Sequence, residues 1–286
     1  MIGFLASYAY FKKDDIATLK SRLYGAPLFA DSGAFSAWNL GLDLRIGEYA
    51  KWLLKAYDKW EVYANLDVIY EPAKTYANQK YLEGRALRPM PVIHMGTSMD
   101  ELKRYIDEGH DYIGLGGLAN RRGVDPTVVK KWADDCFATA DGKTVFHGFA
   151  FVRQNALMEY PWYSVDSSTW IGAERFGTGA LFVDGRIKTL AFSDKKAIAE
   201  NADAIKEHGG ALERFLDGNY NYRDSTEVSV IAYKKLSDWW ADKVPPVKRL
   251  NSPNAVVGPL IYLAGSGTQQ VSRAAFTIEK FRRANA

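Results

Sequence analysis

The stretch MPVIHMGTSMDELKRYIDEGHDYIGLGG, residues 90–117, contains one complete strand–helix–strand unit. Its two ends, 90–94 and 111–116, are short apolar runs of the kind that form buried strands. Between them, Ser98 and Glu101 have the spacing of a capping box, and apolar residues follow at helical intervals. Because an apolar strand, a helix and a second apolar strand follow one another, the stretch predicts two parallel strands of one sheet.

The same alternation extends along most of the chain in both directions. Strand-like runs occupy residues 2–8, 27–32, 61–67, 90–94, 111–116, 144–149, 163–166 and 257–264. Several of these runs show little alternation of polar and apolar residues, as expected for strands buried on both faces. Eight such runs in 286 residues predict an α/β fold of the (β/α)8 TIM-barrel class, whose members typically have about 250 residues.

The pattern changes after the seventh run. Residues 180–192 resemble a hairpin that turns at Asp184-Gly185, a pair of residues that favours tight hairpin turns. Residues 194–242 are mostly helical in pattern. The sequence therefore predicts a single TIM-barrel domain spanning the whole chain, with a mostly helical insertion at about 180–245 between the seventh and eighth strands.

The composition limits the class of protein. A hydrophobic share of 47% suffices for a large core, and a formal net charge of +3 permits nucleic acid as a partner without requiring it. The single cysteine, Cys136, excludes an internal disulfide and a multi-cysteine zinc site. No run approaches the ~20 apolar residues of a membrane span. In residues 1–13 the basic residues follow the apolar ones, the reverse of a secretory signal, so we expect a cytoplasmic protein without a membrane partner.

Three aspartates stand at the C-terminal ends of strand-like runs. They are Asp31 in PLFADSGAF, Asp67 in VYANLDVI and Asp166 in WYSVDSSTW. In β/α barrels the loops that follow the strands form the active site. Any one of these aspartates could instead cap a helix or form an Asx-turn. A carboxylate beside an apolar run is unfavourable unless it is hydrogen-bonded or used, so three together favour a functional pocket.

Glycines and histidines follow other runs. In YIGLGGLAN, Gly116 and Gly117 would let a flat ligand lie against the main chain, or they could simply relieve crowding at a strand end. The spacing is not that of a dinucleotide-binding motif. His147 could orient a carboxylate or touch a substrate, whereas His94 fits a structural role better. No metal site is predicted, because no second histidine or cysteine lies at ligand spacing.

The sequence indicates phosphate-binding residues less clearly than it indicates the carboxylates. Gly265-Ser266-Gly267 follows the last run, where barrels often bind phosphate through backbone N–H groups, but it could be a plain turn. Arg175, shortly after Asp166, is the best single candidate for a phosphate contact. Three basic pairs fit a solvated surface: Arg121-Arg122, Lys248-Arg249 and Arg282-Arg283.

Taken together, these motifs resemble one family. DSGAF, NLDVI, GLGGLAN, HGF and SVDSSTW occur in the order seen in the tRNA-guanine transglycosylase superfamily. The segments YANLDVIYEPAKTYANQKYLE and HGFAF…YPWYSVDSSTW are most similar to its DpdA branch, the phage and bacterial DNA-guanine transglycosylases that put 7-deazaguanine bases into DNA. The resemblance covers about residues 27–180 and is weak beyond them.

The resemblance implies a transferase that exchanges guanine in DNA for a free 7-deazaguanine base such as preQ0, in the host cytoplasm if a bacteriophage encodes it. Asp166 matches the family's nucleophile, which forms a covalent aspartyl-glycosyl intermediate, and Asp31 matches its acid and base. Asp67 matches the residue that recognises the guanine-like edge. Gly116 and Gly117 match the strand whose main chain contacts the base.

Ser32, His147 and Arg175 complete the predicted substrate-binding residues. Extruding a base calls for aromatic surfaces, and candidates near Asp166 are Trp162, Tyr163 and Trp170, unless they belong to the core. The family's tRNA enzymes carry a cysteine-rich zinc site, which one cysteine cannot form, so DNA is favoured over tRNA.

No metal or organic cofactor is expected, because the exchange conserves the energy of the glycosidic bond. Three alternatives stay open: the same reaction on tRNA, a nucleoside or glycoside hydrolase that uses the same carboxylates, and a non-catalytic nucleic-acid-binding barrel. The sequence does not indicate the oligomeric state.

Overall fold

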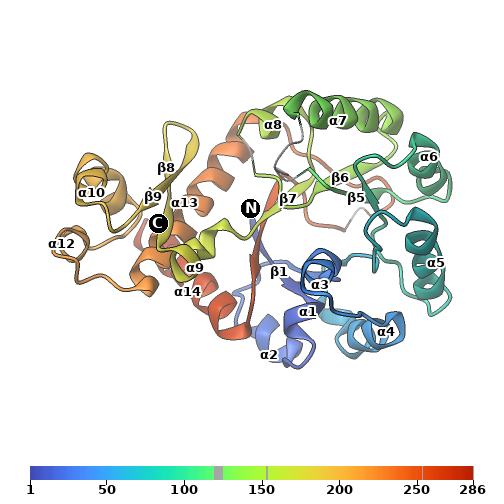
Figure 1. The fold of residues 1–286 in the computed structure, drawn as a ribbon, viewed down its shortest axis with the longest axis horizontal. Helices are drawn as coiled ribbons and strands as arrows, with labels where there is room; N and C mark the ends of the chain where they lie inside the picture. The colour runs from blue at the N-terminus through green and yellow to red at the C-terminus, as the bar shows by residue number, and fades with distance from the viewer. Residues whose placement is uncertain (119–124, 153, 253, 286) are drawn as a thin grey trace.

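The computed structural model describes residues 1–118, 125–152, 154–252 and 254–285. Its centre is a curled sheet of eight parallel strands in the order β3-β2-β1-β10-β7-β6-β5-β4 (Figure 1). The strands are β1 (Ile2–Ser7), β2 (Leu28–Asp31), β3 (Val62–Tyr63), β4 (Val92–His94), β5 (Tyr112–Gly116), β6 (Val145–Gly148), β7 (Ser164–Ser167) and β10 (Leu260–Gly265). The predicted α/β fold is confirmed, and every predicted strand region overlaps one of these strands.

The two outer strands of this order, β3 and β4, are linked by backbone hydrogen bonds next to their ends. The N–H of Met90 donates to the carbonyl oxygen of Tyr63 at 2.8 Å, and the N–H of Asn65 donates to that of Met90 at 2.9 Å. These bonds form a parallel bridge between Ala64 and Met90. The curled sheet is therefore consistent with a TIM-like barrel.

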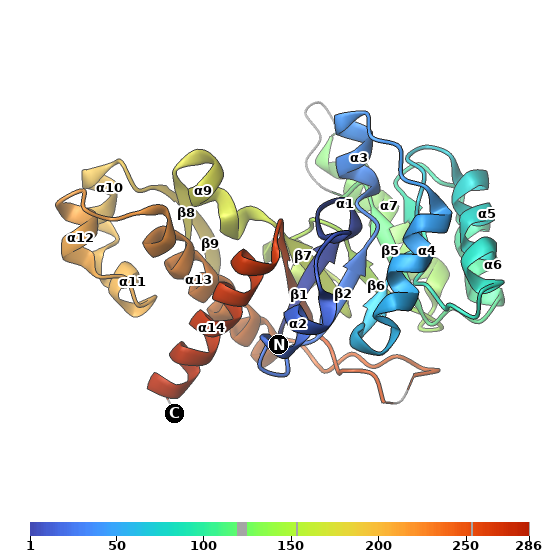
Figure 2. The ribbon, with the colours of Figure 1, turned by 90° about the horizontal axis from the view of Figure 1, so that it is seen from below.

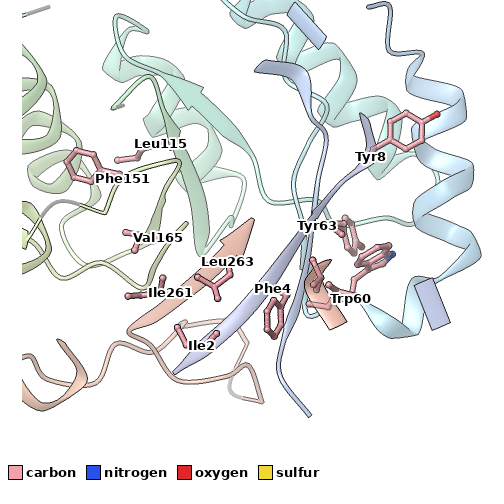
Figure 3. Close-up of a cluster of buried hydrophobic side chains, with 14 of the residues drawn as sticks. Ile2, Phe4, Tyr8, Trp60, Tyr63, Leu115, Phe151, Val165, Ile261 and Leu263 are labelled. Atoms are coloured by element: carbon pink, nitrogen blue, oxygen red, sulfur yellow. The ribbon is translucent and has the colours of Figure 1, made fainter. Parts of the chain in front are cut away.

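Alternate residues of each strand lie in two different hydrophobic clusters. Phe4 and Ile261 belong to a cluster in which strand residues pack against side chains of the helices (Figure 3). Their neighbours Leu5, Phe29 and Tyr262 belong to a cluster formed almost entirely by strand residues, on the inner side of the curl. Because both faces of the strands are buried, apolar residues occupy consecutive positions, which explains the weak alternation in the sequence.

Helices connect the parallel strands and cover the outer face of the sheet (Figures 1 and 2). They are α1 (Tyr8–Phe11), α2 (Ile16–Ser21), α3 (Ala34–Leu40), α4 (Ile46–Lys55), the 3-10 turn η1 (Tyr57–Lys59), α5 (Pro72–Glu83), α6 (Met99–Asp107), α7 (Pro126–Ala140), α8 (Gln154–Glu159) and α14 (Thr268–Ala284). Among the described residues, no helix has the length and apolar character needed to cross a membrane.

The start of α6 differs in part from the prediction. Ser98 caps the helix, because its Oγ accepts the N–H of Asp100 at 3.2 Å. The predicted reciprocal bond from Glu101 is wrong, because the Glu101 carboxylate instead pairs with Arg104 at 3.0 Å. The capping box is thus only half formed.

Between β7 and β10 the chain forms the predicted hairpin and a group of helices. Strand β8 (Thr178–Val183) pairs antiparallel with β9 (Arg186–Ala191), and the turn residues Asp184 and Gly185 have φ angles of 51° and 74°. The helices are η2 (Thr169–Ile171), α9 (Gly172–Phe176), α10 (Lys195–Glu200), α11 (Ala202–Glu207), α12 (Leu212–Leu216) and α13 (Tyr222–Lys243). Apolar side chains of this segment form a cluster of their own, which includes Leu181 and Phe215. Helix α13 contacts both β8 and α14 and so joins this cluster to the rest of the structure.

Candidate active site

A cavity of about 290 Å³ opens at the carboxyl ends of the parallel strands. Its wall includes Asp31, the last residue of β2, Asp67 in the loop after β3, and Asp166 in β7. Gly116 and Arg175 line it as well, and Gly117 lies beside Gly116. The volume is near the lower limit for small-molecule pockets. Sequence positions far apart along the chain are thus brought to one pocket, as the strand-end pattern predicts.

Asp166 is held by two donors on one side. Its Oδ1 accepts the backbone N–H of Ala150 at 2.8 Å and lies 3.3 Å from Nε2 of His147. Ala150 has a φ of 51°, so the loop after β6 takes a left-handed turn that aims its N–H at the carboxylate. Among the described residues no group donates to Oδ2. That oxygen is therefore the one available to a ligand in the cavity.

His147 is fully buried and continues a chain of hydrogen bonds away from the cavity. Its Nδ1 lies 2.6 Å from Oγ of Ser164, which lies 2.5 Å from the hydroxyl of Tyr112. Burial lowers the pKa of His147, which favours the neutral imidazole. One arrangement satisfies every group: Tyr112 donates to Ser164, Ser164 donates to Nδ1, and Nε2–H donates to Asp166. The donors that face Oδ1 then suit a carboxylate anion.

Asp31 has the opposite electrostatic environment. Burial, and after it the charges of Asp67 and Asp166, together raise its pKa from 3.8 to about 7. Its Oδ2 accepts the N–H of Gly33 at 2.9 Å, so the Asx-turn considered for this aspartate is also present. Gly33 has a φ of 76°, and a Cβ atom there would lie 2.6 Å from Cβ of Ala9. Near neutral pH, Asp31 can therefore hold a proton and give it up.

Asp67 is fixed from both sides. The hydroxyl of Ser32 donates to Oδ1 at 2.9 Å, and Nε2 of His94 lies 3.0 Å from Oδ2. The ring of His94 occupies the space beside Gly116, where an added Cβ would lie 2.5 Å from Cδ2 of that ring. His94 also lines the cavity, so the structural role that the sequence favours for it is incomplete. Gly116 makes room for a histidine that positions a carboxylate.

Two predicted substrate contacts occupy other positions. Ser32 and His147 are both fully buried and do not line the cavity. They can act on a ligand only through Asp67 and Asp166, which they position.

The aromatic residues near Asp166 belong to the core. Trp162, Tyr163 and Trp170 are at most 2% exposed. Trp162 and Trp170 donate to the carbonyl oxygens of Ala156 and Ala264, and the hydroxyl of Tyr163 donates to that of Val256. None of the three offers a face on which a base could stack.

The glycine-rich turn after β10 is largely occupied. The N–H of Ser266 donates to Gln270 at 2.9 Å, and the N–H of Thr268 donates to the carboxylate of Asp14 at 3.3 Å. A carboxylate already at the start of α14 disfavours a phosphate there.

The basic pairs contribute little to the cavity. Arg249 binds Asp111 at 2.9 Å and Arg283 binds Glu279 at 2.8 Å, and neither arginine lines the cavity. Arg121 and Arg122 lie outside the described residues. Arg175 is exposed and lines the cavity, so it is the basic side chain that the structure brings to the predicted site.

Sequence reasoning missed Ala150, Ser164 and Tyr112. Ser164 stands two residues before Asp166 on the same strand and therefore faces the same side of the sheet, a signal that the sequence does contain. Tyr112 likewise stands two and four residues before the glycines of β5. Ala150 acts through its backbone N–H, and no side-chain pattern indicates that.

Comparison with known proteins gives no family. No protein-family model matches this chain, and no curated protein sequence matches it. Within the described part of the chain, no three His, Cys, Asp or Glu side chains are placed to hold a metal ion.

Proposed function

We propose that this chain is a DNA-guanine transglycosylase, which exchanges guanine in DNA for a free 7-deazaguanine base such as preQ0. The observation that carries the proposal is the convergence of Asp31, Asp67 and Asp166 on one cavity, with the pKa of Asp31 raised to about 7. Three carboxylates in one small cavity destabilise the fold unless they are used. One protonated and one ionised carboxyl group are what retaining exchange at a sugar requires.

We further propose that the sheet is a closed (β/α)8 barrel and that about residues 180–245 are an insertion in it. The bonds of Met90 to Tyr63 and Asn65, which link β3 with β4, support closure. The separate apolar cluster of the hairpin and helices between β7 and β10 supports the insertion.

In the first step Oδ2 of Asp166 attacks C1′ of the target nucleotide. The C1′–N9 bond breaks, its electron pair leaves with guanine, and protonated Asp31 gives its proton to the departing base. The products are free guanine and an aspartyl-glycosyl ester, and the phosphodiester backbone stays intact. The N–H groups of Ala150 and His147 keep the other oxygen of Asp166 in place during the attack.

The second step is the reverse with another base. Asp31, now ionised, takes a proton from N9 of the entering 7-deazaguanine, N9 attacks C1′, and the C1′–O bond to Asp166 breaks. Both carboxyl groups return to their first state. The exchange therefore balances without an oxidant, a reductant or another co-reactant.

Asp67 is the group that recognises the base in this proposal. A carboxylate that faces the N1–H and the exocyclic amine of a guanine-like base accepts two hydrogen bonds. Ser32 and His94 hold Asp67 in one orientation, and the main chain at Gly116 and Gly117, which line the cavity, offers further contacts. Arg175, which lines the cavity, would bind a backbone phosphate.

The test is incubation of the protein with labelled guanine or preQ0 and either duplex DNA or tRNA. We expect label in DNA, no label in tRNA, a covalent DNA adduct on Asp166, and loss of both in Asp166→Asn. Label in tRNA alone would transfer the assignment to tRNA. Release of free base without incorporation would indicate a hydrolase. Binding of DNA without either product, unchanged in Asp166→Asn, would indicate a non-catalytic binding protein.

A further inference from the structure

Three exposed aromatic side chains form a row beside the cavity. Phe35 and Trp38 belong to α3, and Tyr70 lies in the loop after β3; they are 55%, 54% and 55% exposed. The ring centroids are 6.3 Å apart for Phe35 and Trp38, and 6.0 Å apart for Trp38 and Tyr70. Exposed rings that contact one another form an apolar patch, and such patches mark binding surfaces.

The row is continuous with the cavity. Phe35 lines the cavity, and so does Ile69, the chain neighbour of Tyr70. Figure 2 shows α3 projecting from the end of the sheet at which β2 ends. Trp38 and Tyr70 therefore extend the cavity wall outward, and a polymer with one residue in the cavity would pass over them.

Tyr70 is held in a conformation that bulky residues rarely adopt. Its φ is 63°, in the left-handed region. The loop around it is fixed, because the N–H of Val68 donates to Oγ1 of Thr75 at 2.9 Å and Asn78 donates to the carbonyl oxygen of Leu66 at 2.8 Å. Backbone strain maintained by such contacts is found at ligand-binding sites.

Three cations at this end of the sheet can meet the phosphates of a nucleic acid. Lys12 and Lys13 are exposed directly after α1, whose Tyr10 lines the cavity, and Arg175 lines the cavity too. Within the described ranges none of these three cations forms an ion pair. The acidic Asp43 after α3 lies 3.8 Å from Arg45, so its charge is matched.

We propose that Trp38 and Tyr70 are a stacking platform for unpaired bases that flank the target nucleotide. The inference rests on the proposed function, since a guanine reaches the cavity only after it leaves the base stack. Aromatic rings stack on any base, so such a platform holds a strand whatever its sequence. Paired bases offer only their edges to a protein, and the platform therefore favours a single strand over a duplex.

The test measures binding of a fluorescent single-stranded DNA oligonucleotide in the Asp166→Asn background, where no exchange occurs. Trp38→Ala and Tyr70→Ala should each weaken binding about tenfold, the usual effect of losing one stacked base. Trp38→Phe, which keeps a ring, should restore most of the affinity. The matched control is Phe276→Ala on α14, because Phe276 is 55% exposed but does not line the cavity. It should bind like the parent.

Two outcomes would overturn the platform. One is unchanged binding in the double variant Trp38→Ala/Tyr70→Ala. The other is a dimer of the parent that dissociates in Trp38→Ala while DNA binding stays the same, which would make the row an interface between two copies of the chain.

A separate measurement distinguishes this inference from the proposed function. If the parent chain with Asp166 incorporates labelled base and Trp38→Ala has the same KM for DNA, the platform fails and the transglycosylase stands. If the parent incorporates nothing but Trp38→Ala loses oligonucleotide binding, the platform stands and the reaction fails.

Discussion

The backbone N–H of Ala150 donates to Oδ1 of Asp166 across 2.8 Å, and this bond depends on a left-handed alanine. With its φ of 51°, Ala150 adopts a conformation that residues with a Cβ atom normally avoid. This conformation is unfavourable, but it directs the N–H of Ala150 toward the carboxylate of Asp166. The orientation of the proposed nucleophile is thus set by the backbone of a neighbouring loop.

Replacing Ala150 by glycine tests that conformation. Ala150→Gly relieves the left-handed strain and keeps the N–H, so the free energy of unfolding should rise by up to about 1 kcal/mol. Base exchange should change by no more than a few-fold. Urea denaturation measures the first quantity, and label incorporation measures the second.

The control is Ala199→Gly near the end of α10, where an exposed alanine has a right-handed helical backbone. Glycine should destabilise the protein there by about 1 kcal/mol. If both variants lose the same free energy of unfolding, the left-handed backbone of Ala150 is not strained and the prediction is wrong.

Ser164 tests the chain of hydrogen bonds behind Asp166. Ser164→Ala removes the donor to Nδ1 of His147 and leaves the buried hydroxyl of Tyr112 without its acceptor, so the protein should lose about 1–3 kcal/mol of stability. The tautomer of His147 is then no longer fixed, and its lone pair can face Asp166. We expect a lower kcat with an unchanged KM for DNA.

Tyr112→Phe is the matched control, because it keeps the bond between Ser164 and His147. This variant should lose about 1 kcal/mol of stability and keep its kcat. If Tyr112→Phe lowers kcat as much as Ser164→Ala does, the tautomer of His147 does not determine kcat.

The sequence contains enough to place the strands but not all of their lengths. Both faces of the sheet are buried, so most strands are apolar runs bounded by polar residues. Strand β3 ends at Tyr63, although the predicted strand continues to Asp67. The reason is a contact with α5: the amide of Asn65 donates to the carbonyl oxygen of Thr75, and Oγ1 of Thr75 accepts the N–H of Val68. No local pattern encodes a bond between residues that far apart.

The residues of the candidate site, like the strands, could be predicted only in part. The carboxylates could be predicted because each stands at the C-terminal end of a strand-like run. The partner of Asp67 could not, because His94 reaches it through the register of β4 and β5, which places His94 opposite Gly116. That register is a property of the assembled sheet. It becomes visible only once the neighbouring strands are known.

Asp31 provides a prediction on pH. Its pKa of about 7 in the folded protein lies above 3.8, so the folded chain keeps a proton that the unfolded chain loses. The free energy of unfolding should therefore fall as the pH rises from about 4 to about 7. Asp31→Asn cannot ionise and should lack this fall. At pH 8 the variant should be more stable than the parent by about 1–3 kcal/mol, while exchange drops by about 10²–10⁴-fold.

Urea denaturation at pH 4, 6 and 8 measures this difference. Asp43→Asn is the control, because the Asp43 side chain is 85% exposed and its variant should follow the parent at every pH. Parallel stability curves for Asp31→Asn and the parent would show that the carboxyl group of Asp31 is not protonated in the folded protein.

Gly116 and His94 give the last prediction. A Cβ atom at position 116 would lie 2.5 Å from Cδ2 of His94, so Gly116→Ala should push the imidazole away from Asp67. We expect a loss of about 1–3 kcal/mol of stability from overpacking and a higher KM for the entering base. Gly47→Ala in α4 is the control, since its added Cβ makes only an ordinary contact of 3.4 Å with Tyr81.

The double variant Gly116→Ala/His94→Ala separates the clash from the loss of the histidine. With the imidazole gone, the methyl group of the new alanine has room, so the double variant should be more stable than the sum of the two single losses implies. Its KM for the base should stay high, because Asp67 still lacks a partner on Oδ2. If the losses are additive, the ring of His94 does not fill the space beside Gly116, and the orientation of Asp67 must depend on Ser32 alone.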